Sequence, residues 1–344
     1  MRNFCDMMLS DWQLWAAENS LPDWRASQIA RWAARGAEQP AELTDLSADL
    51  RARLAGEFIF DSLRLEHKLV SRIDQTAKYI FRLRDGNIIE SVLMKYRHGQ
   101  SVCISSQAGC RMACTFCASA GAGFGRSLSH GEMLAQVLRI ARDSGERVGH
   151  VVIMGIGEPM DNYDNLVRFL KRANDPQGLN ISMRHISVST CGLVPEMLKF
   201  TDEGLPVTLS VSLHAPNDLI RRQLMPIARR YSIEELLAAC RRHTDISGRR
   251  ISFEYALFSG VNDQPAHAAE LADRLKGMLC HVNLIPANEF DGGHHRQSSQ
   301  KAVRGFLDQL NRAGVNATVR RELGSDIMAA CGQLRRRIEE CASP

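Results

Sequence analysis

Three closely spaced cysteines constrain this chain more than any other feature of its sequence. They lie in the run Cys110-Arg-Met-Ala-Cys114-Thr-Phe-Cys117, with the spacing C-x3-C-x2-C and an aromatic residue before the last cysteine. A loop this tight can bring three thiolates to one inorganic centre, but it supplies only three ligands. A [4Fe–4S] cluster normally takes four cysteines, so a cluster bound here would keep one iron open to another molecule.

Other uses of these cysteines agree less well with the sequence. Structural zinc usually takes two separated pairs of Cys or His, and the ten cysteines of the chain include no second C-x2-C pair. A disulfide scaffold is expected in short secreted chains, whereas this chain has 344 residues and begins without an apolar export segment. It also lacks an apolar run long enough to span a membrane. We therefore expect a cytoplasmic protein, with no membrane partner, whose thiols serve as ligands or catalysts.

The order of sequence patterns predicts four parts. Residues 1–75 predict a small helical domain, with helical periodicity from about Ser10 to Leu65 and all four tryptophans gathered in an aromatic core. Residues 76–95 predict a β-hairpin that links this domain to the next, with Asp85-Gly86 as its turn. Residues 96–325 predict the core, and residues 326–344 form a C-terminal segment.

Within the core, short β-rich runs alternate with helical stretches, among them 129–142, 233–242 and 297–312. The β-rich runs are 102–105, 150–154, 185–189, 208–213, 252–257, 282–285 and 317–320. Repeated βα units imply a parallel sheet with right-handed crossovers. A curved, partial (β/α)6 barrel fits better than a flat dinucleotide-binding sheet, because no G-x-G-x-x-G follows the first strand. In such barrels ligands bind at the carboxyl ends of the strands.

Several polar side chains follow these strands and so fall on the same face as the cysteine loop. The second strand runs into Gly155-Ile-Gly157-Glu158-Pro159. A G-E-P tripeptide alone is more often a turn, and a lone Ser or His is more often a local hydrogen-bonding group. The other residues in this position are Ser189, Ser212, Leu213, His214 and Asn288.

The cysteine spacing resembles the signature of the radical S-adenosylmethionine (SAM) superfamily. The resemblance implies a [4Fe–4S] cluster held by Cys110, Cys114 and Cys117, with its open iron chelated by the methionine moiety of S-adenosyl-L-methionine. Electron transfer from the cluster then cleaves the sulfonium and generates a deoxyadenosyl radical. The Gly157-Glu158-Pro159 turn corresponds to the superfamily element that contacts the amino group of the methionine moiety.

A closer resemblance covers nearly the whole chain. The runs Ser105–Cys117, Met154–Pro159, Ser212–Ala215 and Asp326–Leu334, together with the opening Pro22–Ile29, are similar to the RlmN family of bacterial radical SAM methyltransferases, which modify carbon 2 of adenine in ribosomal RNA. The resemblance implies that cofactor is bound by Gly157, Glu158, Ser189, Ser212, Leu213, His214 and Asn288. The loop that follows Asn288 departs from the sequence common in the family.

The resemblance also implies how three further residues act. One SAM methylates Cys331, and a second is cleaved so that the S-methyl group can be activated and added to the adenine. Glu90 accepts the adenine proton, and Cys103 attacks the sulfur of Cys331 to release the product, leaving a transient disulfide. From the residues alone, Glu90 would be an exposed hairpin carboxylate, Cys103 a buried strand residue and Cys331 a packing residue.

The implied partners are 23S rRNA, transfer RNA as a second substrate, and an electron donor such as flavodoxin or ferredoxin. Basic doublets agree with an RNA partner, since they would contact phosphates, although each alone is more often a solvated helix face. These doublets are Arg221-Arg222, Arg229-Arg230, Arg241-Arg242, Arg249-Arg250, Arg320-Arg321 and the triplet at Arg335. Two alternatives stay open: a Cfr-like methyltransferase acting on adenine carbon 8, and a non-catalytic RNA-binding or electron-transfer protein that holds a passive metal.

Overall fold

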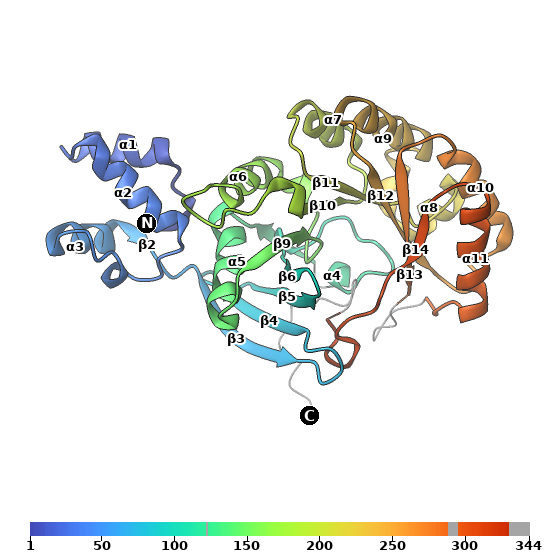
Figure 1. Ribbon diagram of the computed structural model, residues 1–344, viewed down its shortest axis with the longest axis horizontal. Coiled ribbons are helices and arrows are strands. Elements are labelled where there is room, and N and C mark those ends of the chain that lie inside the picture. The colour runs from blue at the N-terminus through green and yellow to red at the C-terminus, as the bar shows by residue number, and fades with distance from the viewer. Residues whose placement is uncertain (122, 288–294, 330–344) are drawn as a thin grey trace.

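The computed structural model describes residues 1–121, 123–287 and 295–329. Its amino-terminal part is a separate helical unit (Figure 1). Aromatic side chains form the centre of this unit: Phe4 and Trp12 are fully buried and their rings lie 5.1 Å apart. Trp15 belongs to the same cluster, whereas Trp24 is exposed and stacks under Arg25. The unit contains the short strands β1 (Arg2–Asn3) and β2 (Phe58–Ile59) and the helices α1 (Leu9–Glu18), α2 (Asp23–Ala34) and α3 (Ala48–Glu57).

Ten strands form one continuous sheet, in the order β14-β13-β12-β11-β10-β9-β6-β5-β4-β3. From β6 to β14 every neighbouring pair is parallel. These parallel strands are rich in Val, Ile and Leu because helices or cavity cover both of their faces. Their bounds are β6 (Gly99–Cys103), β9 (Val148–Ile153), β10 (Ile186–Thr190), β11 (Thr208–Ser212), β12 (Ile251–Leu257), β13 (Cys280–Pro286) and β14 (Ala317–Val319).

One layer of helices covers the outer face of this sheet (Figure 1). A helix follows each of the first six parallel strands, so the predicted partial (β/α)6 barrel is confirmed, with β14 added as a short further strand. Two of the longest helices begin with capping boxes, in which Ser129 pairs with Glu132 and Ser232 with Glu235. The helices are α5 (His130–Ser144), α6 (Tyr163–Ala173), α7 (Val194–Asp202), α8 (Asp218–Leu224), α9 (Ile233–Ser247), α10 (Pro265–Leu275) and α11 (Gln300–Arg312).

Three antiparallel strands extend the barrel sheet at the β6 edge. They are β3 (Leu63–Val70), β4 (Ala77–Leu83) and β5 (Ile88–Tyr96). The helical periodicity expected as far as Leu65 was wrong for its last residues, because the chain is already extended from Phe58. The hairpin predicted around Asp85-Gly86 exists, and its strands pair directly with the core.

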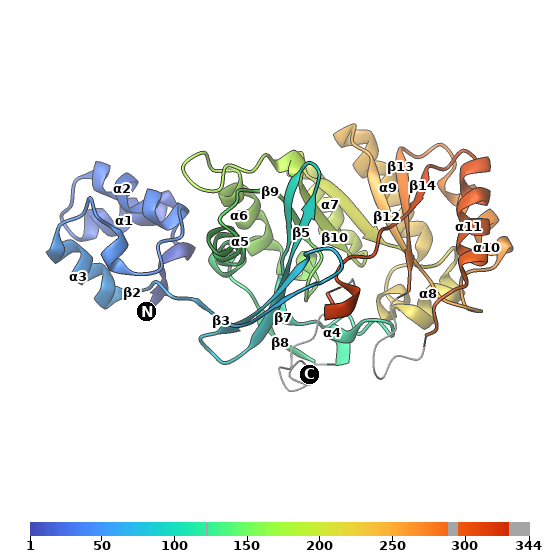
Figure 2. The same cartoon turned by 60° about the horizontal axis from the view of Figure 1, so that its bottom comes forward.

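The connection between β6 and α5 carries the cysteine loop. It contains β7 (Gln107–Gly109), α4 (Ala118–Gly121) and β8 (Phe124–Ser127), with β7 and β8 paired as a separate small antiparallel sheet. After β14 the chain turns back across the open side of the sheet toward the β3–β4 turn (Figures 1 and 2). There it forms a short 3-10 turn at Ser325–Ile327.

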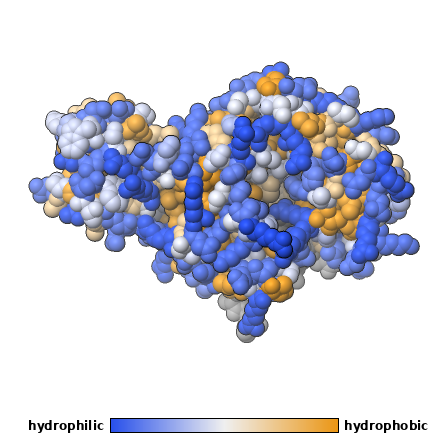
Figure 3. All heavy atoms as spheres, in the orientation of Figure 1, coloured by the Kyte–Doolittle hydropathy of each residue, from blue (hydrophilic) through white to orange (hydrophobic). Residues whose placement is uncertain are grey.

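The surface agrees with a packed α/β core. On the face drawn in Figure 3, hydrophilic residues predominate and apolar residues gather in separate patches. Within the described ranges, no helix combines the length and the apolar character that crossing a bilayer would require.

Candidate active site

One large cavity opens at the carboxyl ends of the parallel strands. It holds about 1000 Å³ of empty space, counted to its open mouth, and its wall takes residues from every strand between β9 and β13. The residues predicted from sequence that line it are Cys110, Cys114, Cys117, Gly157, Glu158, Ser189, Ser212 and His214. The structure therefore brings together side chains that are up to about a hundred positions apart in the chain, at the end of the barrel where ligands bind.

The cysteine loop is fixed to the barrel by its own backbone and by the aromatic residue between its cysteines. The backbone N–H of Thr115 donates to the carbonyl of Leu224 at 3.0 Å, and that of Cys117 to the carbonyl of Cys114 at 3.2 Å. The ring of Phe116 packs edge-on against His214, with centroids 4.7 Å apart. This contact explains the aromatic residue in the motif, because it anchors the loop against the cavity wall.

The cysteines of this loop are half-buried in the cavity wall. Burial raises the pKa of Cys110 to about 12 and raises that of Cys114 well above its ordinary value, and the neighbouring thiols add to the effect. Cys110 and Cys114 are therefore protonated in the bare loop, and a metal centre must displace these protons when it binds. The loop supplies three soft sulfur donors and contains neither a histidine nor a fourth cysteine, which suits an iron–sulfur cluster with one open iron.

A single metal ion fits the same region less well. In the described ranges, no three His, Cys, Asp or Glu side chains are gathered so that they could hold one metal ion. A cluster of four irons takes its three thiolates on three different irons, so these sulfurs need not converge on one point. The cavity thus satisfies what a cluster requires of the loop: three thiols on one wall, with empty space in front of them.

Two glycines shape the turn after β9. A Cβ at Gly155 would lie 2.7 Å from the carbonyl oxygen of Ile104. Gly157 has φ +109°, and a Cβ there would lie 2.6 Å from the Cβ of Gln107. The side chain of Gln107 completes the turn, since its Oε1 accepts from the backbone N–H of Glu158 at 2.9 Å. Only glycine lets the turn lie this close to the β7 segment.

Glu158 is a buried carboxylate at the end of this turn. Its Oε1 accepts from the N–H of Met160 at 3.0 Å and its Oε2 from the N–H of Cys191 at 2.7 Å. Burial nevertheless raises the pKa of this carboxyl group. Within the described part of the chain no Lys or Arg forms an ion pair with it, so no side-chain cation offsets the burial. A cationic amine in the cavity would supply the missing countercharge, as the amino group of a methionine moiety would.

His214 presents a defined donor to the cavity. Its Nδ1 accepts the backbone N–H of Ala256 at 2.9 Å, so the ring proton is on Nε2. Burial, reinforced by Arg221, lowers the pKa of His214 to about 3 and keeps the ring neutral. Leu213 is fully buried behind the wall, and its backbone N–H donates to the carbonyl of Glu254. Asn288 lies outside the described residues.

Glu90 is not the exposed hairpin carboxylate that its sequence context alone suggested. Its Oε2 lies 3.0 Å from the Nζ of Lys78, and both side chains are only 1% exposed. Lys78 also donates to the carbonyl of Met328 at 3.3 Å. The backbone carbonyl of Glu90 accepts from the Oγ of Ser105, which in turn accepts from the N–H of Ile156 at 3.0 Å. The backbone of Glu90 is thereby joined through Ser105 to the turn that leads to Gly157.

Cys103 ends β6 beside the same turn. It is buried among Val92, Met94 and Ile156, in a small cluster to which Leu323 and Ala329 also belong. The segment that contributes Ala329 is held by reciprocal bonds to the β3–β4 turn. The Asp74 carboxylate accepts from the N–H of Gly324 and the Asp326 carboxylate from the N–H of Arg72, each at 2.9 Å. Cys331 lies outside the described residues.

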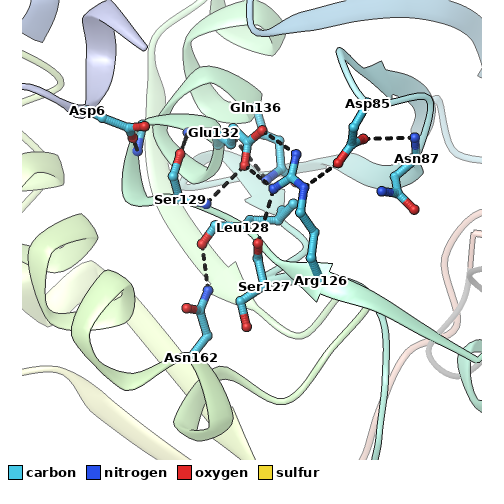
Figure 4. Close-up of polar contacts among 11 residues, drawn as sticks. Asp6, Asp85, Asn87, Arg126, Ser127, Leu128, Ser129, Glu132, Gln136 and Asn162 are labelled. Carbon is cyan, nitrogen blue, oxygen red and sulfur yellow. Dashed lines mark hydrogen bonds and ion pairs between the residues drawn. The ribbon is translucent and has the colours of Figure 1, made fainter. Parts of the chain in front are cut away.

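Arg126 braces the hairpin that carries Glu90 (Figure 4). Its guanidinium forms two bonds of 2.7 Å to the carboxylate of Glu132 at the start of α5, and it contacts Asp85 in the β4–β5 turn. Ser129 and Glu132 form the capping box of α5 at the same place. Bidentate contacts of this kind fix geometry as well as charge, so the turn of the hairpin is held against the start of α5.

The sequence prediction missed several residues of the cavity wall. Glu254 is 4% exposed and accepts from the Nδ2 of Asn283 at 3.1 Å, and Arg320 lies 3.6 Å from its Oε2. An acidic residue inside the otherwise apolar strand Ile251–Leu257 is a signal that could have identified it. Cys191 also lines the cavity. The phosphate contact expected of Arg221 was wrong, because this side chain is fully buried.

Comparisons with known proteins agree with this geometry. Residues 104–272 match the family model described as the radical SAM superfamily. The probable dual-specificity RNA methyltransferase RlmN of Clostridium tetani is 49% identical over 98% of this chain and 97% of its own length. The corresponding protein of Alkaliphilus oremlandii is 51% identical over 91% of each chain.

A solved structure extends the agreement to the whole fold. The crystal structure of a radical SAM methyltransferase from Sphaerobacter thermophilus is 42% identical, with a TM-score of 0.94 over 98% of this chain and 100% of that chain. Membership of the superfamily implies a [4Fe–4S] cluster and SAM as cofactors. The resemblance found in the sequence is thus confirmed: this chain belongs to the RlmN family of radical SAM RNA methyltransferases.

Proposed function

We propose that this enzyme methylates carbon 2 of an adenine in 23S rRNA, with transfer RNA as a second substrate, through an S-methylated Cys331. The observation that carries the proposal is the convergence of two sites on one turn. The cavity with the cysteine loop lies on one side of Gly155–Gly157, and the Glu90–Cys103 region lies on the other. Because RNA is the proposed substrate, we also propose the cytoplasm as its location.

An electron-poor aromatic carbon is methylated only by a radical route. The cluster and SAM together would supply a radical that activates a methyl group on sulfur. We propose that Cys110, Cys114 and Cys117 hold the cluster and that Glu158 pairs with the amino group of SAM. In this arrangement Ser189, Ser212 and His214 bind the remainder of the cofactor, together with Leu213 and Asn288. Two SAM molecules are used in each turnover, one as methyl donor to Cys331 and one as radical source.

The remaining steps belong to residues of the second region. Cys331 carries the methyl carbon, and Glu90 accepts the proton that leaves the adenine. The thiolate of Cys103 attacks the sulfur of Cys331, so the bond between that sulfur and the transferred carbon breaks as a disulfide forms. The carbon takes up a proton to become the product methyl group, and the one electron left by the radical addition would return to the cluster. The position of the preceding segment supports these roles. Ala329, two residues before Cys331, packs in the cluster of Cys103, and the carbonyl of Met328 accepts from the lysine that is paired with Glu90.

An electron donor such as flavodoxin or ferredoxin completes the proposal. Both are small carriers, and the exterior of the cysteine loop offers a surface for one. A shallow hollow there is lined by Arg111, Met112 and Ile227, and by the basic pair Arg229 and Arg230. Basic residues around an apolar centre attract an acidic carrier protein and favour rapid association.

Mass spectrometry of the peptide that contains Cys331 tests the two-cysteine route. We expect an S-methyl group on Cys331 in the wild type and a covalent nucleotide adduct that accumulates in Cys103→Ala. Cys280→Ala, which removes another buried cysteine far from the cavity, should behave as the wild type. Nucleoside analysis of treated RNA then distinguishes 2-methyladenosine from 8-methyladenosine. Unmodified Cys331 in protein with a full cluster would refute the route, and 8-methyladenosine would assign the enzyme to the C8 alternative.

A further inference from the structure

Arg221 is one of the largest fully buried side chains described, and it lies directly behind the cavity wall. It belongs to α8, and its guanidinium reaches the carboxyl ends of two neighbouring strands. Nη2 donates to the carbonyl of Cys191 at 2.7 Å and to that of Ser212 at 3.3 Å, and Nε donates to the carbonyl of Leu213 at 3.3 Å. The side chain therefore joins β10 to β11 at the level of the cavity.

Among the described residues, no acidic side chain forms an ion pair with this guanidinium, and Asp218 of the same helix acts on it only from a distance. All three of its hydrogen bonds go to carbonyl oxygens, and its Nη1 has no acceptor among the described residues. Arginine does not lose its proton in proteins, and a buried cation is costly unless an anion compensates it. A wholly structural role in tying two strands would be served by a neutral donor at lower cost.

The guanidinium of Arg221 lies behind the part of the cavity wall that also includes the cysteine loop. Cys191 and Ser212, whose carbonyls it holds, line the cavity together with Cys114. The helix that carries Arg221 also anchors the cysteine loop, because the carbonyl of Leu224, at the end of α8, accepts from the backbone N–H of Thr115 at 3.0 Å. Arg221 thus lies one helical turn from the residue that anchors the cysteine loop, and a negatively charged group held by the three thiols would offset the buried charge of its guanidinium.

We propose that Arg221 is a positioning residue that stabilises the reduced form of the cluster and so raises its reduction potential. This inference rests on the proposed function, in which Cys110, Cys114 and Cys117 hold that cluster. Reduction adds one negative charge to a group whose ligands are already thiolates. A fixed cation nearby therefore stabilises the reduced state more than the oxidised state. The neighbouring Arg222 is exposed and cannot act in this way.

A redox titration followed by electron paramagnetic resonance, without SAM, tests the proposal on the cluster-loaded protein. In Arg221→Gln we expect the ratio of reduced to oxidised cluster at a fixed potential to fall about tenfold, which is 59 mV for a one-electron couple. Arg222→Gln removes the same charge from the adjacent position and should leave the potential unchanged. An unchanged potential in Arg221→Gln, or an equal shift in both variants, would overturn the proposal.

Arg221→Lys separates charge from hydrogen-bonding geometry. It keeps a cation but loses the planar donor pair, so its potential should stay close to that of the wild type. A fall as large as that in Arg221→Gln would assign the effect to geometry and overturn the role of charge. If Arg221→Gln does not fold, Cys240→Asp replaces it. This substitution adds a carboxylate at a buried thiol whose pKa Arg221 already lowers against burial, and an unchanged potential would again refute the proposal. Failure of the wild type to bind a cluster would instead refute the proposed function.

Discussion

The buried ion pair of Lys78 and Glu90 makes a sharp prediction about stability. In Lys78→Met, the carboxylate of Glu90 keeps its place in the interior but loses the ammonium group 3.0 Å away. Removing one partner of a buried pair typically costs about 3–5 kcal/mol of folding free energy. The side chain can avoid the charge by binding a proton. Protonation of Glu90 costs about 1.4 kcal/mol for each pH unit above its unfolded-state pKa of about 4.3. Protonation therefore limits the loss of folding free energy to about 4 kcal/mol near pH 7.5.

The sign of the pH dependence follows from the same reasoning. Once Glu90 is protonated in the folded variant and ionised in the unfolded chain, each further pH unit removes about 1.4 kcal/mol of stability. We therefore expect the difference between Lys78→Met and the wild type to grow from about pH 6 to about pH 8. Replacing both partners, as in Lys78→Met with Glu90→Leu, should recover much of the loss, because both charges of this pair are then removed from the interior.

Urea denaturation followed by far-ultraviolet circular dichroism measures these differences. Tryptophan fluorescence is unsuitable, because all four tryptophans lie in the first thirty-two residues and report on the helical unit. Lys95→Met is the matched control: its partner Glu146 is 3.6 Å away, and the two side chains are 43% and 58% exposed. That pair should contribute no more than about 1 kcal/mol. Equal losses in the two lysine variants, or a double variant no more stable than Lys78→Met, would refute the reasoning.

Two further predictions concern the cavity wall. Gly157→Ala should cost about 1–3 kcal/mol of stability through its positive φ and should weaken SAM binding measured by calorimetry; the control Gly149→Ala, whose methyl group would meet nothing nearer than 3.9 Å, should do neither. His214 has a pKa of about 3 in the folded protein, below its unfolded-state pKa of about 6.5. As the pH is lowered below about 6.5, the protein therefore loses about 1.4 kcal/mol of stability per pH unit through this residue. In chemical denaturation, His214→Gln should remove this part of the loss of stability at acid pH, whereas the exposed control His67→Gln should not. Equal pH profiles of stability for the wild type and His214→Gln would contradict this prediction.

The alternation of strand and helix patterns was sufficient to predict the barrel, because buried parallel strands are short apolar runs whose boundaries are turns. The same rule failed near Leu65. There β3 is an edge strand in which only Leu63 is buried, and its alternation of apolar and polar residues stops after Glu66, so too short a pattern separates it from a solvated helix. Its pairing with β4 is a tertiary contact, which local sequence propensity does not predict.

The cavity residues divide in a similar way. The cysteine loop and the Gly157–Glu158 turn could be placed from sequence, since each directly follows a recognisable strand. Lys78 and Arg221 could not, because a basic residue looks alike whether it is solvated or buried, and only the packing around it decides. Gln107 was missed for a related reason: its role is to hold a turn that lies about fifty residues further along the chain.

The two ends of the open sheet have a consequence for how the molecule behaves in concentrated solution. Among the strands that the structure describes, β14 and β3 each pair with a neighbour on one side only, and an unpaired strand edge invites pairing between molecules. At one end, β14 has only three residues. At the other, the longer β3 carries Arg64, Glu66 and Lys68 at its rim, and its register with β4 is interrupted after Leu65. Shortness at one edge and charge with irregular pairing at the other let the barrel stay open for its ligands without promoting aggregation.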